Sequence, residues 1–483
     1  MQELFNFHPS GLRRLVFKNA SAIILGRVIN LILAIVSSVL ITRYLGSDRL
    51  GQYASLYAYI ALFGWLTTLG IDQIIVRESA KHKEQAEQIF ATATAVSCLL
   101  SVGATLLAIV GSLASGYVHS MRLLLFIAAI EILLLSPLKL LGLIFQLSLK
   151  QWYAAGISIA RQMLWVIVIG ALILTGAGLP GVILGRLLCS GLEALAILLF
   201  SRRLLPFKLR LDTGIARSIL KSSWPIALSG LSISIYQRVD QILLHVLSGN
   251  RALGYYVAAV NISELFGIFA AALTSTMFPL LSEVASQKDR FEYYIKICFR
   301  YLMSLLFGIC AVVTVSAPFM VRIFYGKAFI SSGTILSTLI WSEAGVFLGV
   351  VICTALISQG LQKYVLISTF VGALVNLALN LLWIPKWGNM GAAWATVISY
   401  NLAGFFIFFI FPKTRGICII GAKESIAPFF IGLASAAIFV LSHKSFVIVL
   451  VPFVYLSALF ALKIWKISDI YEIFAIFKTK EKY

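Results

Sequence analysis

Apolar stretches long enough to cross a lipid bilayer recur along this chain and constrain its fold more than any other feature. A helix needs roughly 20 apolar residues to span the hydrocarbon core. Fourteen such segments occur, at approximately 19–41, 51–76, 89–115, 121–148, 152–176, 179–201, 222–248, 253–284, 295–319, 332–358, 361–384, 388–412, 425–442 and 445–465. The chain is 60% hydrophobic and 12% charged, whereas soluble domains contain about 25% charged residues. The pattern predicts an all-α, polytopic membrane protein with about 14 transmembrane helices.

Some boundaries in this pattern leave alternatives open. Ser136-Pro137 interrupts the fourth segment, where proline would either kink the helix or mark a re-entrant end. The break between the fifth and sixth segments falls near 176–179. For the last two segments the pattern does not decide whether both cross the membrane.

Two parts of the chain match each other when the sequence is shifted by 203 positions. Residues 18–67 align with 221–270 without a gap, and 13 of the 50 pairs are identical. Gly46 pairs with Gly249, and Gly51 with Gly254. Duplicated membrane proteins commonly bind their cargo between the halves, near the bilayer midplane. The repeat therefore indicates transport.

The distribution of positive charge predicts the orientation of the spans. If the N-terminus is cytoplasmic, 25 Lys and Arg residues fall in cytoplasmic segments and 8 on the opposite side. By the positive-inside rule both termini are then cytoplasmic, and both copies of the repeat enter the membrane in the same direction. Topology accounts for most of the net charge of +20. Without a folded basic domain, we expect no nucleic-acid partner.

The repeat and the charges together predict four parts. An N-lobe of helices one to six covers residues 1–201, and a C-lobe of helices seven to twelve covers 222–412. Between them lies a basic cytoplasmic linker, 202–221, which carries no apolar core. The remaining residues, 413–483, form two C-terminal helices and a cytoplasmic tail.

Several function classes are excluded. The chain has no Walker loop, no dinucleotide-binding fingerprint and no nucleophile elbow. No connecting loop exceeds about 20 residues, so a soluble catalytic or ATPase domain has no room. A membrane-embedded glycosyltransferase or polymerase would need a sizeable outer loop with catalytic residues. We therefore expect a secondary transporter, not an enzyme, with no cofactor except a coupling ion.

Ionisable side chains inside the predicted spans are the most informative residues. They are Arg27, Glu131, Lys139, Arg161, Arg186, Glu193, Arg238, Asp240, Glu264, Arg300 and Glu343. Each costs about 2.5 to 3.5 kcal/mol at a helix centre, so they predict an interior lined by protein or water. We interpret Arg186 and Glu193, which are seven residues apart on one helix face, as structural, together with Arg300 near its helix start.

Other charged residues lie in the helices that carry the repeat. Arg27 and Asn30 share one face of the first helix. Arg238 and Asp240, two residues apart, point about 200° from each other, so they cannot simply neutralise one another. Glu264 lies in the eighth helix. We predict that these residues line a central cavity.

Three segments resemble a known family. They are Thr42-Arg43-Tyr44-Leu45-Gly46, Leu50-Gly51-Gln52-Tyr53 and Tyr236-Gln237-Arg238-Val239-Asp240-Gln241-Ile242-Leu243-Leu244. They look like the first and seventh helices of Wzx-type polysaccharide flippases, which handle O-antigen or capsule repeat units. These belong to the multidrug/oligosaccharidyl-lipid/polysaccharide exporter superfamily, and the resemblance covers essentially the whole chain.

The resemblance implies both a fold and an activity. The implied fold is two six-helix lobes around a V-shaped cavity lined by helices one, two, seven and eight. The implied activity is alternating-access transfer of an undecaprenyl-diphosphate-linked oligosaccharide from the cytoplasmic to the periplasmic leaflet of a bacterial inner membrane. A monomer is expected, with polysaccharide polymerase and chain-length proteins as partners.

A diphosphate crossing a low-dielectric slab needs compensating cations. Arginine suits phosphate because it donates bidentate hydrogen bonds. The predicted substrate-binding residues are Arg27, Asn30, Lys139, Arg161, Arg238 and Glu264. Further contacts with sugars are expected from Gln146, Gln162, Trp165 and Tyr236.

A candidate coupling site is similar to the sodium site of the lipid II flippases in the same superfamily. The matching residues here are Asp240, Asn376, Asn380, Ala392 and Thr396. Asn380 stands where those flippases have an aspartate, which leaves one carboxylate. That suits weak sodium binding, or a proton on Asp240. Alternatively, Asn376 and Asn380 only form hydrogen bonds between helices.

One other transport function stays open. A multidrug or other amphiphile exporter would have the same fold. An arginine-rich cavity argues against cationic drugs.

Overall fold

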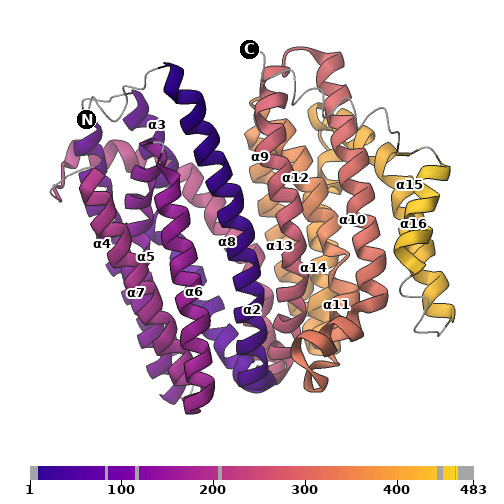
Figure 1. Cartoon of the computed structure of the whole chain (residues 1–483), viewed down its shortest axis with the longest axis horizontal. Coiled ribbons are helices and arrows are strands. Elements are labelled where there is room, and N and C mark those ends of the chain that lie inside the picture. Colours follow the sequence, from indigo (N-terminus) through magenta and orange to yellow (C-terminus); the bar gives the residue numbers. More distant parts are fainter. Residues whose placement is uncertain are drawn as a thin grey trace. The chain divides into compact units, whose positions relative to one another are not determined.

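The computed structural model describes residues 9–81, 85–114, 119–148, 150–204, 209–442, 450–462 and 464–465. Within these ranges the chain forms helices and turns, and no strand (Figure 1). The chain divides into two units, Met1–Gly254 and Tyr255–Tyr483. This division differs from the predicted lobe and linker boundaries, which stay predictions.

The first unit is built from long helices. They are α2 (Pro9–Gly64), the 3₁₀ turn η1 (Trp65–Thr67), α3 (Ile71–Lys81), α4 (Ala86–Ala114), α5 (His119–Leu147), α6 (Gln151–Thr175), α7 (Gly178–Leu204) and α8 (Thr213–Ser263), the last of which continues into the second unit. Helix α2 packs on α6, α4 on α5, and α7 on both α5 and α6. Figure 1 shows α4 to α7 running alongside one another.

The second unit follows with shorter breaks between its helices. Its elements are η3 (Glu264–Phe266), α9 (Gly267–Glu283), α10 (Lys288–Tyr325), η4 (Lys327–Phe329), α11 (Ser332–Leu339), α12 (Ser342–Ser358), α13 (Gln362–Trp387), α14 (Asn389–Gly404), η5 (Phe406–Phe409), α15 (Pro412–Ser442) and α16 (Leu450–Ala461). Helix α10 packs on α15, α13 on α14, and α12 on α9 and α14. Arg300 of α10 pairs with Glu424 of α15 at 2.8 Å, consistent with its predicted structural role.

Eleven helices in the described ranges are long and apolar enough to cross a membrane. Two of them, Leu25–Thr67 and Gly230–Ala270, each contain a kink and correspond to two predicted segments. The other nine correspond to one segment each. The last prediction falls on α16, which has 12 residues and is therefore about 18 Å long, short of a typical hydrocarbon core. The protein is a polytopic, all-α membrane protein.

The kinks in α2 and α8 occur at equivalent positions of the repeat. Gly46 has φ 67° and ψ 178°, and Gly249 has φ 82° and ψ 175°. This backbone region is essentially restricted to glycine. Each kink turns the chain inside an otherwise continuous helix, which explains why both copies have glycine there.

The two copies also contact each other beside their kinks, within the first unit. A Cβ atom on Gly51 would lie 1.8 Å from the carbonyl oxygen of Asn250, and one on Gly254 would lie 1.8 Å from that of Ser47. The shift of 203 that relates Gly51 to Gly254 also relates Ser47 to Asn250. The contact is therefore reciprocal, as expected for two copies related by an approximate twofold axis.

The structure decides two boundaries that the sequence left open. Pro137 lies inside α5, which continues on both sides of it, so no re-entrant end forms there. The chain turns between α6 and α7 through Gly176 and Gly178, both of which have positive φ.

The expectation that the linker lacks an apolar core is wrong in part. Ala216 and Ile219, at the start of α8, are buried in a hydrophobic cluster with Ile71, Ile75 and Phe90. Asp212 caps this helix start by accepting hydrogen bonds from the backbone of residues 214 and 215.

Candidate functional site

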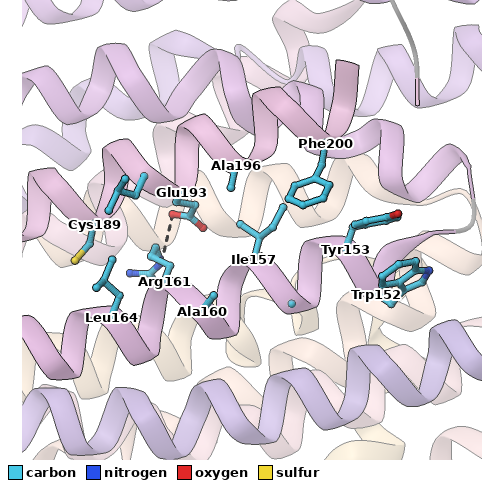
Figure 2. Close-up of a pocket in the computed structure, with 12 residues that line it drawn as sticks. Trp152, Tyr153, Ile157, Ala160, Arg161, Leu164, Cys189, Glu193, Ala196 and Phe200 are labelled. Atoms are coloured by element: carbon cyan, nitrogen blue, oxygen red, sulfur yellow. Dashed lines mark ion pairs between the residues drawn. The ribbon is translucent and has the colours of Figure 1, made fainter. Parts of the chain in front are cut away.

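A groove of about 490 Å³ runs along the seam between α6 and α7 in the first unit. Its lining is mostly apolar and comes from both helices at helical spacing, for example Ile157 and Leu164 opposite Leu192 and Ala196. Figure 2 shows a charged pair midway along the groove and three aromatic rings towards one end.

The charged pair joins the two helices. Arg161 Nε of α6 lies 3.3 Å from Glu193 Oε2 of α7, and both side chains are only partly exposed. Lys139 of α5 also acts electrostatically on Glu193. Only Arg161 forms an ion pair with Glu193, whereas Lys139 is exposed, and the Glu131 carboxylate acts on Glu193 as well.

Further hydrogen bonds hold Arg161 in place. Its Nη2 donates to Gln162 Oε1 at 2.8 Å, and Gln162 Nε2 donates to Ser37 Oγ of α2 at 3.0 Å. Gln162 therefore connects helices and is not available for sugar hydroxyls. Trp165, also expected to contact sugar, is only 5% exposed and packs inside the unit.

A second ionic network joins α5 and α7 in the same unit. Arg186 Nε of α7 lies 3.3 Å from Glu131 Oε2 of α5, and its Nη1 donates to the Tyr53 hydroxyl at 2.6 Å. Ser190 donates to the same carboxylate at 2.9 Å. The guanidinium lies 4.0 Å from the centre of the Tyr57 ring, within cation–π range.

These two networks correct the partners suggested by sequence spacing. Arg186 and Glu193 are on one helix, but each pairs with a different neighbour, Glu131 and Arg161 respectively. Seven residues along a helix amount to about 10.5 Å, so helices packed alongside offer closer partners.

The remaining predicted cavity residues differ in exposure. Arg27 is exposed on α2, and the half-buried Asn30 donates through Nδ2 to the Gly26 carbonyl at 2.9 Å. On α8, Arg238 is half-buried and Asp240 is 5% exposed, in agreement with their opposite directions. Glu264 is exposed in η3, where the helix is broken.

Four of the predicted coupling residues lie in the second unit, and all four are buried. Asn376 Nδ2 of α13 donates to Ser399 Oγ of α14 at 2.8 Å. Asn380 Nδ2 donates to the Asn376 carbonyl and to its Oδ1, at 2.9 and 3.0 Å. Asn380 Oδ1 is buried without a hydrogen-bond partner. Ala392 lies on α14, buried like its neighbours.

Thr396, the last of these residues, connects to the repeat. Its hydroxyl lies 3.1 Å from the hydroxyl of Tyr256. Tyr256 is the repeat equivalent of Tyr53, whose hydroxyl accepts a hydrogen bond from Arg186. Helices α7 and α14 correspond to the sixth and twelfth predicted segments, the last of each predicted lobe. The equivalent tyrosines thus reach a fixed cation in the first unit and neutral oxygens in the second.

Sequence reasoning missed several residues of these sites. Trp152, Tyr153 and Phe200 line one end of the groove, and the rings of Trp152 and Tyr153 stack 3.8 Å apart. Aromatic residues near helix ends are typical of membrane interfaces, so their sequence carried no specific signal. Ser399 lies three residues after Thr396 on the same apolar helix, and this spacing could have identified it from the sequence.

Comparison with known proteins identifies the family. The family model for polysaccharide biosynthesis proteins matches residues 16–285, more than half of the chain. A second model, described as MatE, matches residues 225–382.

Individual relatives are distant. The chain is 24% identical over 187 residues to the probable low-salt glycan biosynthesis flippase Agl15 of Haloferax volcanii, covering 38% of this chain and 40% of that protein. It is 21% identical over 210 residues to the capsular polysaccharide biosynthesis protein CapF of Staphylococcus aureus, covering 43% of this chain and 53% of that protein. The matched region thus spans about half the length of these relatives or less.

The fold has a match across nearly the whole chain. The lipid II flippase MurJ in an inward closed conformation superposes with a TM-score of 0.74 and 17% identity, covering 92% of this chain and 98% of that chain. At this identity the likeness establishes the fold alone. Together with the model match over residues 16–285, it shows that the chain belongs to the polysaccharide biosynthesis protein family.

Proposed function

We propose that the protein is a flippase that moves an undecaprenyl-diphosphate-linked oligosaccharide from the cytoplasmic to the periplasmic leaflet of a bacterial inner membrane. Family membership supports a role in polysaccharide biosynthesis. Relatives bear the names of a glycan biosynthesis flippase and a capsular polysaccharide biosynthesis protein. The duplication supports alternating access by two six-helix lobes, 1–201 and 222–412.

One observation supports this function most directly. Arg161 pairs with Glu193 on the wall of a groove whose lining is mostly apolar, and the exposed Lys139 also acts electrostatically on Glu193. Such a site suits an amphiphile with an anionic head, because its diphosphate would bind the basic side chains while its hydrocarbon stays in an apolar environment. Arg27, Asn30, Arg238 and Glu264 complete the proposed substrate path.

Transport against a gradient needs an ion, and we assign sodium or proton antiport to Asp240 and the cluster of Asn376, Asn380, Ala392 and Thr396. The unpaired, buried Oδ1 of Asn380 supports an oxygen-coordinated cation, because a buried acceptor without a partner is costly. The repeat supports it as well. Tyr256 contacts Thr396 in the second unit, and its equivalent Tyr53 contacts the cation Arg186 in the first. The bound ion would supply positive charge that is absent from the four residues of the second unit.

The experiment is transport of a fluorescent undecaprenyl-diphosphate disaccharide in proteoliposomes, read by quenching of the label exposed outside. Arg238→Ala and Asp240→Asn are expected to abolish transfer, and to abolish surface polysaccharide in cells, while expression is intact. Arg161→Ala should reduce transfer, whereas Arg217→Ala, exposed in the first turn of α8, should not. Normal transfer by the Arg238 and Asp240 variants would remove both residues from the mechanism.

A multidrug exporter is the second candidate, favoured by the MatE match over residues 225–382. It predicts uptake of an organic cation such as ethidium into the same vesicles. Under the proposed function, ethidium uptake stays at the level of protein-free liposomes. The membrane location, the cytoplasmic termini, the monomeric state and partnership with polymerase and chain-length proteins belong to the same proposal.

A further inference from the structure

A buried carboxyl group in the second unit has no role in the proposed transport path. Glu343, in the first turn of α12, is 6% exposed. Its Oε1 accepts a hydrogen bond from the Ser263 hydroxyl at 3.2 Å. Ser263 is the last residue of α8 and is itself 2% exposed.

Nothing in the described part of the chain neutralises this carboxyl group. The ion pairs of the second unit's α10 and α15 use Glu424, with Arg300 and Lys296, and Glu343 forms no ion pair with any described residue. The backbone amides of residues 343 and 344 donate to the carbonyls of Ile340 and Trp341. These two N–H groups are therefore already used and do not solvate a negative charge on Glu343.

The groups that surround Glu343 add no positive charge. Glu264 of η3 and Cys310 of α10 are the titratable groups that act on it electrostatically, and Glu264 repels a negative charge. Helix α14 contributes the amide of Asn401, which donates to the Trp341 carbonyl, and the neutral phenol of Tyr400, whose backbone lies against Gly345. Helix α15 contributes the ring of Phe429, 5.9 Å from that of Trp341.

The other elements packed on α12 carry their titratable groups elsewhere. The first titratable groups of α13 are Lys363 and Tyr364. They follow Ser358, which lies at the opposite end of α12 from Glu343. On α9 the acidic residue is Glu283, at its last position. Helix α11 carries no titratable side chain, and its Leu339 carbonyl accepts a hydrogen bond from the Ser342 hydroxyl. An isolated ionised carboxylate in such surroundings is strongly disfavoured over the neutral acid.

We propose that Glu343 is a proton-binding site that couples proton entry to transport. In this proposal its carboxyl group carries the proton while it is buried beside Ser263. When the second unit rearranges so that water reaches the end of α8 and η3, the O–H bond of Glu343 breaks and the proton passes to water. A proton taken from water on the opposite side restores the acid. This inference rests on the proposed flippase function and adds Glu343 to the proposed coupling residues, with a proton as the ion that it binds.

The break in the chain beside Glu343 fits this role. Helix α8 ends at Ser263, η3 covers Glu264–Phe266, and α9 begins at Gly267. A Cβ atom on Gly267 would meet nothing within 4 Å, so space exists at this junction. The Ser263 hydroxyl and the exposed Glu264 thus connect the buried acid to an accessible position at a helix break.

The test uses the full-length protein in two measurements. Infrared difference spectroscopy between acidic and alkaline buffer should show the C=O band of a buried carboxylic acid in the wild-type protein. The band should be missing in Glu343→Gln and unchanged in Glu283→Gln, a matched control exposed at the end of α9. In proteoliposomes, a pH gradient should accelerate transfer of the fluorescent undecaprenyl-diphosphate disaccharide by the wild type and by Glu283→Gln. Glu343→Gln should retain only the rate seen without a gradient.

The possible results separate the two proposals. Absence of the band in the wild type, or full acceleration by the gradient in Glu343→Gln, overturns the proton site. If sodium but not a pH gradient accelerates the wild type, the assignment of the proton is likewise overturned. If the wild type does not move the labelled lipid at all, the flippase function is wrong. In that case the proton site is tested by two other measurements. They are the infrared band and gradient-driven proton entry, which is measured with pyranine trapped in the vesicles.

Discussion

Ionised side chains inside this protein are arranged in two ways. Arg186 and Glu131 neutralise each other and share three further polar or aromatic neighbours, Tyr53, Tyr57 and Ser190. Glu193, by contrast, pairs with Arg161 on the wall of the groove, and Lys139 and Glu131 also act on it electrostatically. The first arrangement is typical of a structural network, and the second lies beside the proposed substrate groove.

Removal of the arginine from this network should be costly. Arg186→Met leaves the buried Glu131 without its counter-ion, and because Arg186 itself is partly exposed we expect the protein to lose about 1 to 3 kcal/mol of stability. The double variant Arg186→Met/Glu131→Gln should recover most of this loss. Thermal unfolding in detergent, monitored by tryptophan fluorescence, measures the stability of the single and the double variant. Arg217→Met serves as an exposed control. Equal losses in the single and double variants would show that the pair is not coupled.

At the scale of the helices, glycines that recur in both copies have different physical roles. Gly46 and Gly249 permit the kinks because of their positive φ. Gly51 and Gly254 permit close approach of the two copies, since the nearest atoms belong to the opposing backbone. Gly64 and Gly267 have helical φ values of −60° and −58° and open space around them.

These differences predict a graded response to alanine. Gly51→Ala and Gly254→Ala should each destabilise the protein by about 1 to 3 kcal/mol, because a backbone carbonyl 1.8 Å from the new Cβ cannot simply rotate away. Gly64→Ala and Gly267→Ala should stay within about 0.5 kcal/mol. Unfolding temperatures of the four variants in one detergent give the comparison. Equal tolerance of all four would contradict the contact between the copies.

Across the whole molecule, the two copies of the repeat keep several residues in common but differ in the partners of one of them. Both copies keep the kink, the contact glycine and the tyrosine at positions 53 and 256. The partners of these tyrosines differ, with Arg186 in one unit and Thr396 in the other. The two copies of the repeat thus keep the same tyrosine, while its partner is a cation in one unit and a hydroxyl group in the other.

The predicted orientation of the whole molecule can be tested by labelling. Single cysteines at Arg210 and Lys327, both exposed, would be introduced after the six native cysteines are replaced by serine. A membrane-impermeant maleimide should reach position 327 from outside intact cells and position 210 only after the membrane is opened, because the charge bias places them on opposite sides. Labelling of both positions in intact cells would contradict the topology.

The amino-acid sequence by itself determined the helical class, nearly all of the spans, the duplication and the family resemblance. These follow from local properties, namely the length of apolar runs, the backbone restrictions at glycine and the residues that recur in both copies of the repeat. It also identified Arg161, Asn376, Asn380 and Thr396 as residues of interest. Only the tertiary structure decided that Arg161 meets Glu193, that Arg186 meets Glu131, and that Glu343 is buried beside Ser263. Partners on different helices depend on the rotation and depth of each helix in the packed unit, which spacing along one helix does not specify.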